Sequence, residues 1–122
     1  MRLENAIINR SFVEAMGATV ENNVIKSVNV DIVGHFGNAV CLEILCKDVR
    51  PVSMYQNIGN IGYVIRAFVE FFDLSKDDGI KLSQIKDIPC RLVFDKSEKC
   101  IGFGSFMEDK FVLTSHFVNI DE

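Results

Sequence analysis

The sequence predicts one α+β domain: a twisted antiparallel sheet of five to six strands with one main helix packed on one face. Several segments alternate apolar and polar residues with the period of two that is typical of strands. One segment instead shows the three- and four-residue spacing of a helix face. The 122 residues are too few for two domains that each have a core. We therefore interpret residues 1–122 as a single domain.

The first half of the chain is expected to form three strands joined by short links. Residues 3–15 are rich in Ile, Phe and Val and are predicted to form the first strand. Residues 24–33 alternate apolar and polar side chains and are predicted to form the second. After a turn at residues 35–38, residues 39–47 repeat this alternation. Three consecutive strands with short links indicate an antiparallel meander.

The middle of the chain changes its period and predicts the main helix. Residues 48–57 are expected to be irregular, because the residue before Pro51 disfavours helix and no clear period follows. The helix is predicted from Ile61 to Phe72, with Asn60 at the N-cap position. Its apolar face consists of Ile61, Val64, Ile65, Phe68 and Phe72. Such a helix is expected to cover the sheet.

The second half is expected to return to strands. Residues 83–87 are predicted to form one short helical turn, and residues 90–95, 99–107 and 111–114 three strands separated by polar turns. Gly102 and Gly104 within a strand indicate close backbone packing or a bulge. No element is predicted after residue 114.

Composition and charge restrict the classes of partner. With 48 % hydrophobic and 25 % charged residues, the chain is typical of a soluble globular protein. Apolar residues are abundant for this size, so we expect some to be covered in a homo-oligomer, a dimer or larger. The net charge is −4 and no basic cluster exists, so direct nucleic-acid binding is not expected. An acidic balance is compatible with a basic protein partner.

The termini and cysteines indicate an intracellular location. The first residues lack the apolar core of a signal peptide, and no stretch approaches the about 18 apolar residues of a membrane span. We expect a cytoplasmic protein with no membrane partner. The four cysteines are widely spaced and form no C-x-x-C pair, so free, mostly buried thiols are expected. They are Cys41, Cys46, Cys90 and Cys100.

The densest set of ligand-type side chains lies between Arg50 and Asn60. Long irregular loops often carry binding residues, so a small ligand is expected there first. The candidate ligand-binding residues are Arg50, Tyr55, Asn57, Asn60 and, on the following helix, Arg66. Gly59 and Gly62 near the helix start match neither a P-loop nor a dinucleotide motif, which favours a structural role for both glycines.

Catalytic and metal chemistry find little support in the sequence. The only histidines, His35 and His116, have no close-spaced partner of the kind that zinc sites use. Acidic residues between 73 and 87 lack the spacing of a calcium loop. We therefore expect no metal, no cofactor and no enzymatic activity. A small enzyme with a Cys–His pair formed by the fold remains an alternative.

Several short segments together resemble a group of small proteins encoded by phages and prophages of Firmicutes and gut bacteria. The segments that carry the resemblance are Leu3-Glu4-Asn5-Ala6-Ile7-Ile8, Ile65-Arg66-Ala67, Ile85-Lys86-Asp87-Ile88-Pro89-Cys90-Arg91-Leu92, Ile101-Gly102-Phe103 and Asp109-Lys110-Phe111. The chain departs from the group in having Phe111 where Trp is favoured, and in lacking the glycine-rich centre of many members.

The resemblance implies a phage accessory protein that inhibits a bacterial defence system. The first expectation is an anti-CRISPR-like inhibitor that binds a host defence protein stoichiometrically in the bacterial cytoplasm. The alternative is an oligomeric sponge that sequesters a cyclic nucleotide signal. That alternative requires an interface that collects Arg50, Arg66 or Arg91 with an aromatic side chain such as Tyr55.

Overall fold

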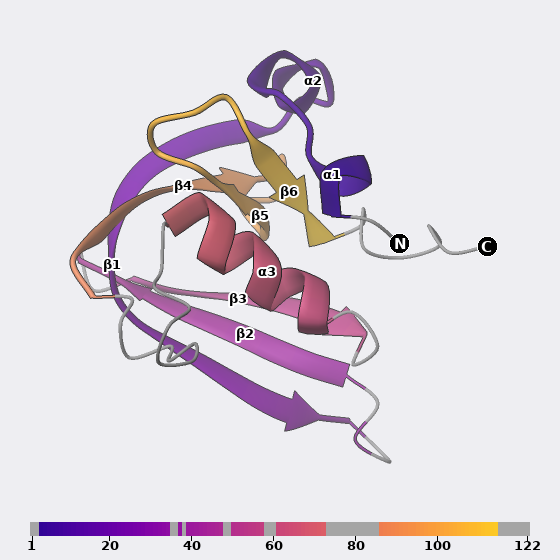
Figure 1. The fold of residues 1–122 in the computed structure, drawn as a ribbon, viewed down its shortest axis with the longest axis vertical. Coiled ribbons are helices and arrows are strands. Elements are labelled where there is room, and N and C mark those ends of the chain that lie inside the picture. The colour runs from indigo at the N-terminus through magenta and orange to yellow at the C-terminus, as the bar shows by residue number, and fades with distance from the viewer. Residues whose placement is uncertain are drawn as a thin grey trace.

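The described part of the protein forms a six-stranded antiparallel sheet together with the helices α1, α2 and α3 (Figure 1). The computed structural model describes residues 3–34, 37, 39–47, 50–57, 61–72 and 86–114. Its elements are α1 (Leu3–Ala6), α2 (Arg10–Ala15), β1 (Thr19–Val33), β2 (Ala39–Cys46), β3 (Pro51–Asn57), α3 (Ile61–Phe72), β4 (Ile88–Phe94), β5 (Cys100–Gly104) and β6 (Phe111–Leu113). The strand order is β3-β2-β1-β4-β5-β6. The predicted α+β class is confirmed.

Strand β1 is long and belongs to both halves of the sheet. Its first part pairs with β4, and its second part with β2, and Ile25 is paired with both. A register shift between Ile25 and Ser27 marks a bulge, which bends a strand. Three consecutive strands with the fourth returning beside the first form a Greek key. The bend brings β3 against β5, so the sheet curls into a partly open barrel (Figure 1).

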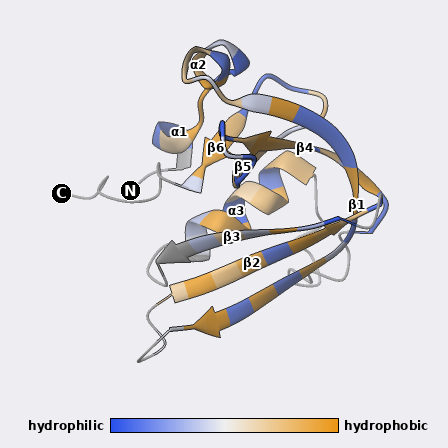
Figure 2. Cartoon of the chain, turned by 180° about the vertical axis from the view of Figure 1, so that it is seen from behind, coloured by the Kyte–Doolittle hydropathy of each residue, from blue (hydrophilic) through white to orange (hydrophobic). Residues whose placement is uncertain are grey.

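Helix α3 fills the concave side of this curled sheet. Phe68 stacks on Phe103 of β5 with ring centroids 4.5 Å apart, and Phe71 and Phe72 flank the same ring at 5.9 and 6.0 Å. All four rings are buried. The strands supply the alternation that this requires, since buried residues alternate with more exposed ones along β2, and inward apolar residues alternate with outward polar ones along Ser27–Asp31 of β1 (Figure 2). The predicted helix over Ile61–Phe72 is confirmed to the residue.

A second apolar cluster lies on the opposite face of the sheet, under α2. Val13 of α2 packs with buried residues of two strands, namely Val93 of β4 and Phe111 and Leu113 of β6, and with Ala18. Ile8 anchors this layer, because its backbone exchanges two hydrogen bonds of 2.8 Å with Phe111. Both faces of the β4–β6 region are therefore covered.

The predicted strand over residues 3–15 is wrong, because this segment forms α1 and α2. Asn9 is an N-cap whose side chain accepts a hydrogen bond from the Phe12 N–H, which favours a helix start over strand propensity. Gly17 then takes a φ of 84° and ends the turn. A helix buries Val13 on one face, so the β-branched residues of this segment did not need a strand to become buried.

The predicted irregular stretch over residues 48–57 is also wrong over most of its length. Residues 51–57 form β3, which pairs antiparallel with β2. Pro51 is compatible with the first residue of a strand at the sheet edge, where no donor is needed. Val52 and Met54 are buried while Tyr55 is exposed, so the strand does alternate.

The remaining elements differ from the prediction at their ends. β1 begins at Thr19 rather than at residue 24, and β5 stops at Gly104 rather than at residue 107. β5 stops there because the Ser105 hydroxyl accepts a hydrogen bond from the Glu108 N–H and closes a turn. Most of the predicted turn over residues 83–87, both histidines and the tail lie outside the described residues. None of the described helices has the length and apolarity to cross a membrane.

Alanine substitution at Gly102 tests whether β5 and β6 pack too closely at this position to admit a side chain. A Cβ at Gly102 would lie 2.3 Å from the Val112 carbonyl oxygen, whereas a Cβ at Gly62 on α3 meets nothing within 4 Å. We expect Gly102→Ala to lower the free energy of unfolding by about 1–3 kcal/mol. Gly62→Ala should raise it by up to about 1 kcal/mol. Urea unfolding of both variants measures this, and equal effects would contradict the packing argument.

Candidate functional site

The predicted ligand residues occupy separate places in the fold. The Arg50 guanidinium pairs with Glu21 and lies 4.9 Å from the centre of the Phe94 ring. Tyr55 is 60 % exposed on the outward face of β3 beside Cys41 of β2, and the side-chain hydrogen bond with Cys41 raises the pKa of Tyr55. Arg66 is exposed on α3. Asn60 and the side chain of Asn57 lie outside the part of the chain that the structure describes.

These residues are not brought together by the part of the chain that the structure describes. Arg50 and Tyr55 are five residues apart along an extended segment, which corresponds to about 17 Å. Arg66 lies on the concave side of the sheet and Tyr55 on the other. Arg50 instead lines a small cavity of about 250 Å³ between β3 and β5, with Lys99 and Glu98 at its edge. Binding of a nucleotide by this set stays a prediction.

A larger cavity, of about 500 Å³, lies where α3 ends beside β4 and the β5–β6 loop. We call it the α3–loop groove. It is lined by Glu70, Phe71, Phe72, Ile88, Pro89, Ser105, Phe106, Met107 and Glu108. Its volume is within the range of ligand sites, and most of its lining is aromatic or aliphatic.

The loop wall of the groove is held by its own hydrogen bonds. Ser105 is buried; its N–H donates to the Lys110 carbonyl oxygen at 2.9 Å, and its hydroxyl accepts from the Glu108 N–H at 3.2 Å. Behind the groove, the Arg91 guanidinium lies 5.8 Å from the centre of the Phe106 ring. These contacts fix the loop while Met107 at its tip stays 85 % exposed.

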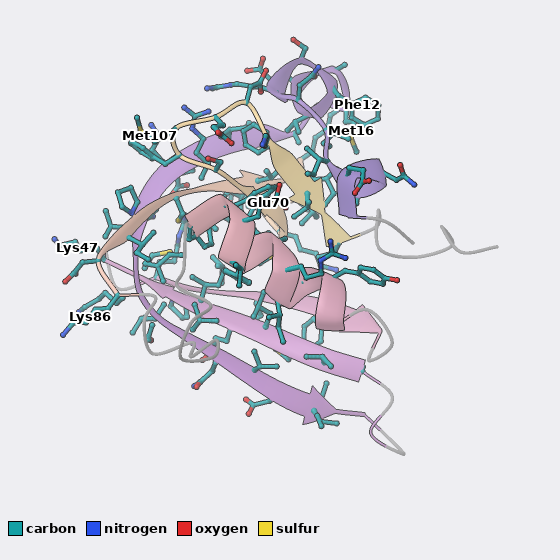
Figure 3. All side chains as sticks on the ribbon, in the orientation of Figure 1. Phe12, Met16, Lys47, Glu70, Lys86 and Met107 are labelled. Atoms are coloured by element: carbon teal, nitrogen blue, oxygen red, sulfur yellow. The ribbon has the colours of Figure 1, made fainter. Side chains whose placement is uncertain are left out.

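Two carboxylates give the groove a negative rim. Glu70 is exposed on the last turn of α3 and forms no ion pair with any residue that the structure describes. Glu108 forms an ion pair of 3.1 Å with Lys110, and both side chains are partly exposed. Figure 3 shows Glu70 on the helix and Met107 on the loop. An apolar floor with a negative rim can bind an apolar group that carries a cation.

Sequence reasoning missed this groove. Phe106 and Met107 were expected at the end of a strand, and Glu108 in a plain polar turn. The available signal was the apolar pair Phe106-Met107 directly before the polar Glu108-Asp109-Lys110 run. That signal alone does not reveal that α3 and Ile88 lie across from it.

The cysteines are free and mostly buried, as predicted. Burial raises the pKa of the Cys90 thiol to about 12 and that of Cys100 to about 11, from an ordinary value of 9.0. A buried thiol of this kind stays protonated and is a poor nucleophile. Within the described ranges, no group of three or more His, Cys, Asp or Glu side chains is arranged to hold a metal ion.

The raised thiol pKa values predict a loss of stability in alkali. Below pH about 9 both states keep these protons, and above it the unfolded chain loses them first, so the free energy of unfolding falls as pH rises toward 12. Cys90→Ala should flatten the fall by about 1.4 kcal/mol per pH unit. Urea unfolding at pH 8, 9, 10 and 11 measures it, with Val93→Ala as the control, a buried residue of the same strand that does not ionise. An unchanged slope for Cys90→Ala would contradict the assignment.

Comparison with known proteins adds no family to this description. No protein-family model matches the chain, and neither a curated protein nor a solved structure shows significant similarity to it.

Proposed function

We propose that this chain is a non-catalytic binding protein that docks on a partner protein through the α3–loop groove. The observation that carries the proposal is Met107, which is 85 % exposed at the rim of a cavity with an aromatic floor. Large exposed apolar side chains beside an apolar cavity are typical of interaction sites. Burying one such side chain contributes about 1.5–3 kcal/mol.

The groove favours binding over chemistry. Its polar groups are two exposed carboxylates and a hydroxyl that already accepts a hydrogen bond within the loop. Phe71, Phe72 and Phe106 supply a floor of rigid rings, and rigid rings lose little entropy on binding. A firm loop with an exposed apolar tip is suited to insertion between side chains of another protein.

The finer form of the proposal is inhibition of a bacterial defence system by stoichiometric binding. Its support is the resemblance to phage-encoded accessory proteins together with a surface suited to a protein partner. The chain would then act in the bacterial cytoplasm by covering a functional surface of a host defence protein. A nucleotide sponge is less well supported, because the larger cavity has a negative rim, which repels phosphate.

Substitution of Met107 tests the docking proposal against a matched control. Met107→Ser removes the exposed apolar tip, and Met16→Ser removes another exposed methionine, at the C-cap of α2 and outside the groove (Figure 3). We expect wild type and Met16→Ser to capture the same protein from extracts of the bacterial host. Met107→Ser should recover about tenfold less of it, which corresponds to about 1.4 kcal/mol. Quantitative mass spectrometry measures the yields, and equal recovery by both variants would refute the role of the groove.

A further inference from the structure

We infer that the α3–loop groove accepts a basic amphipathic peptide segment of the partner, and this inference rests on the proposed function. An apolar side chain of the segment packs on Phe71, Phe72 and Phe106. A lysine or arginine next to it pairs with Glu70, and a second with Glu108. The occupant is thus distinguished by positive charge beside an apolar anchor.

The end of α3 supports a cationic occupant. A helix C-terminus carries partial negative charge, and natural helices often place Lys, Arg or His in the last turn. The last turn of α3 has no basic residue and instead carries Glu70. The negative end of the helix and the Glu70 carboxylate therefore add, and among the described residues no ion pair compensates Glu70.

The opposite wall of the groove repeats this charge. Glu108 projects from the loop and is exposed, and its ion pair with Lys110 is a surface pair of the kind that contributes little and exchanges readily. The Arg91 cation lies against the Phe106 ring rather than among the lining residues. Both carboxylates thus face an incoming cation from separate elements.

The exposed tip favours a peptide over a small free cation. Met107 lies at the rim and is 85 % exposed, so a ligand confined to the cavity leaves it in water. A peptide that continues beyond its anchor residue covers it. The net charge of −4 adds a long-range attraction for such a basic segment.

Selection from a random dodecapeptide display library tests both the docking function of the groove and its preference for a basic segment. The probe is the library itself, panned on wild-type protein and counter-selected on Met107→Ser. We expect enriched peptides that combine Lys or Arg with a large apolar residue. If the enriched peptides are neutral or acidic and still require Met107, docking stands but the basic segment is wrong. If no peptide distinguishes wild type from Met107→Ser, the docking function itself fails.

Charge-neutralising variants then locate the contacts with one enriched basic peptide. Glu70→Gln and Glu108→Gln should each weaken its binding about two- to fivefold, as exposed ion pairs do, and the double variant about tenfold. The matched control is Glu43→Gln, which removes the same charge from the outward face of β2. This variant should bind the peptide with the same affinity as wild type. Fluorescence anisotropy at two salt concentrations gives the affinities.

Two outcomes of these measurements would overturn the inference. If Glu43→Gln weakens peptide binding as much as Glu70→Gln and Glu108→Gln do, the effect comes from net charge and not from the groove. The groove could also be covered by a second copy of this chain. In that case wild type sediments as a dimer, Met107→Ser sediments as a monomer, and the library peptide competes with dimer formation.

Discussion

The bend of β1 near Ile25 is the constraint on which the rest of the structure depends. At that residue one strand passes from pairing with β4 to pairing with β2, and Ile25 itself is fully buried. A straight strand of fifteen residues would hold the two halves of the sheet in one plane. Because β1 bends, β3 reaches β5, and the concave side encloses the apolar face of α3.

That enclosure explains the unusual apolarity of α3. A helix on a flat sheet buries one stripe, but Val69 and Phe71 are buried as well as Phe68 and Phe72. The curled sheet contacts these additional side chains. The same curvature brings the end of the helix beside the loop that follows β5. The α3–loop groove is therefore a consequence of the curvature, because Phe71 and Phe72 pack around Phe103 of β5 and also line the groove.

The accuracy of prediction from sequence followed the strength of local patterns. The period of α3 and the alternation of β2 are strong, and both elements were predicted within a residue of their ends. Residues 3–15 failed because a single N-cap at Asn9 outweighed β propensity, and β3 failed because Pro51 suggested a loop. The groove was beyond reach for another reason. Its helix wall and its loop wall are 33 or more positions apart, since Phe72 and Ser105 meet only through the register of β4 and β5.

The groove combines two features that do not stabilise the fold, and this combination argues for a role in binding. An exposed Met107 gains nothing from folding, and Glu70 at the negative end of α3 is unfavourable there. A chain optimised for stability alone would carry a polar residue at the loop tip and a basic residue in the last helical turn. Both departures lie on the same cavity, and one occupant relieves both, because an apolar group covers Met107 and a cation neutralises Glu70. If the exposed Met107 and the unfavourable Glu70 had arisen independently of any ligand, they would not be expected to lie beside the same cavity.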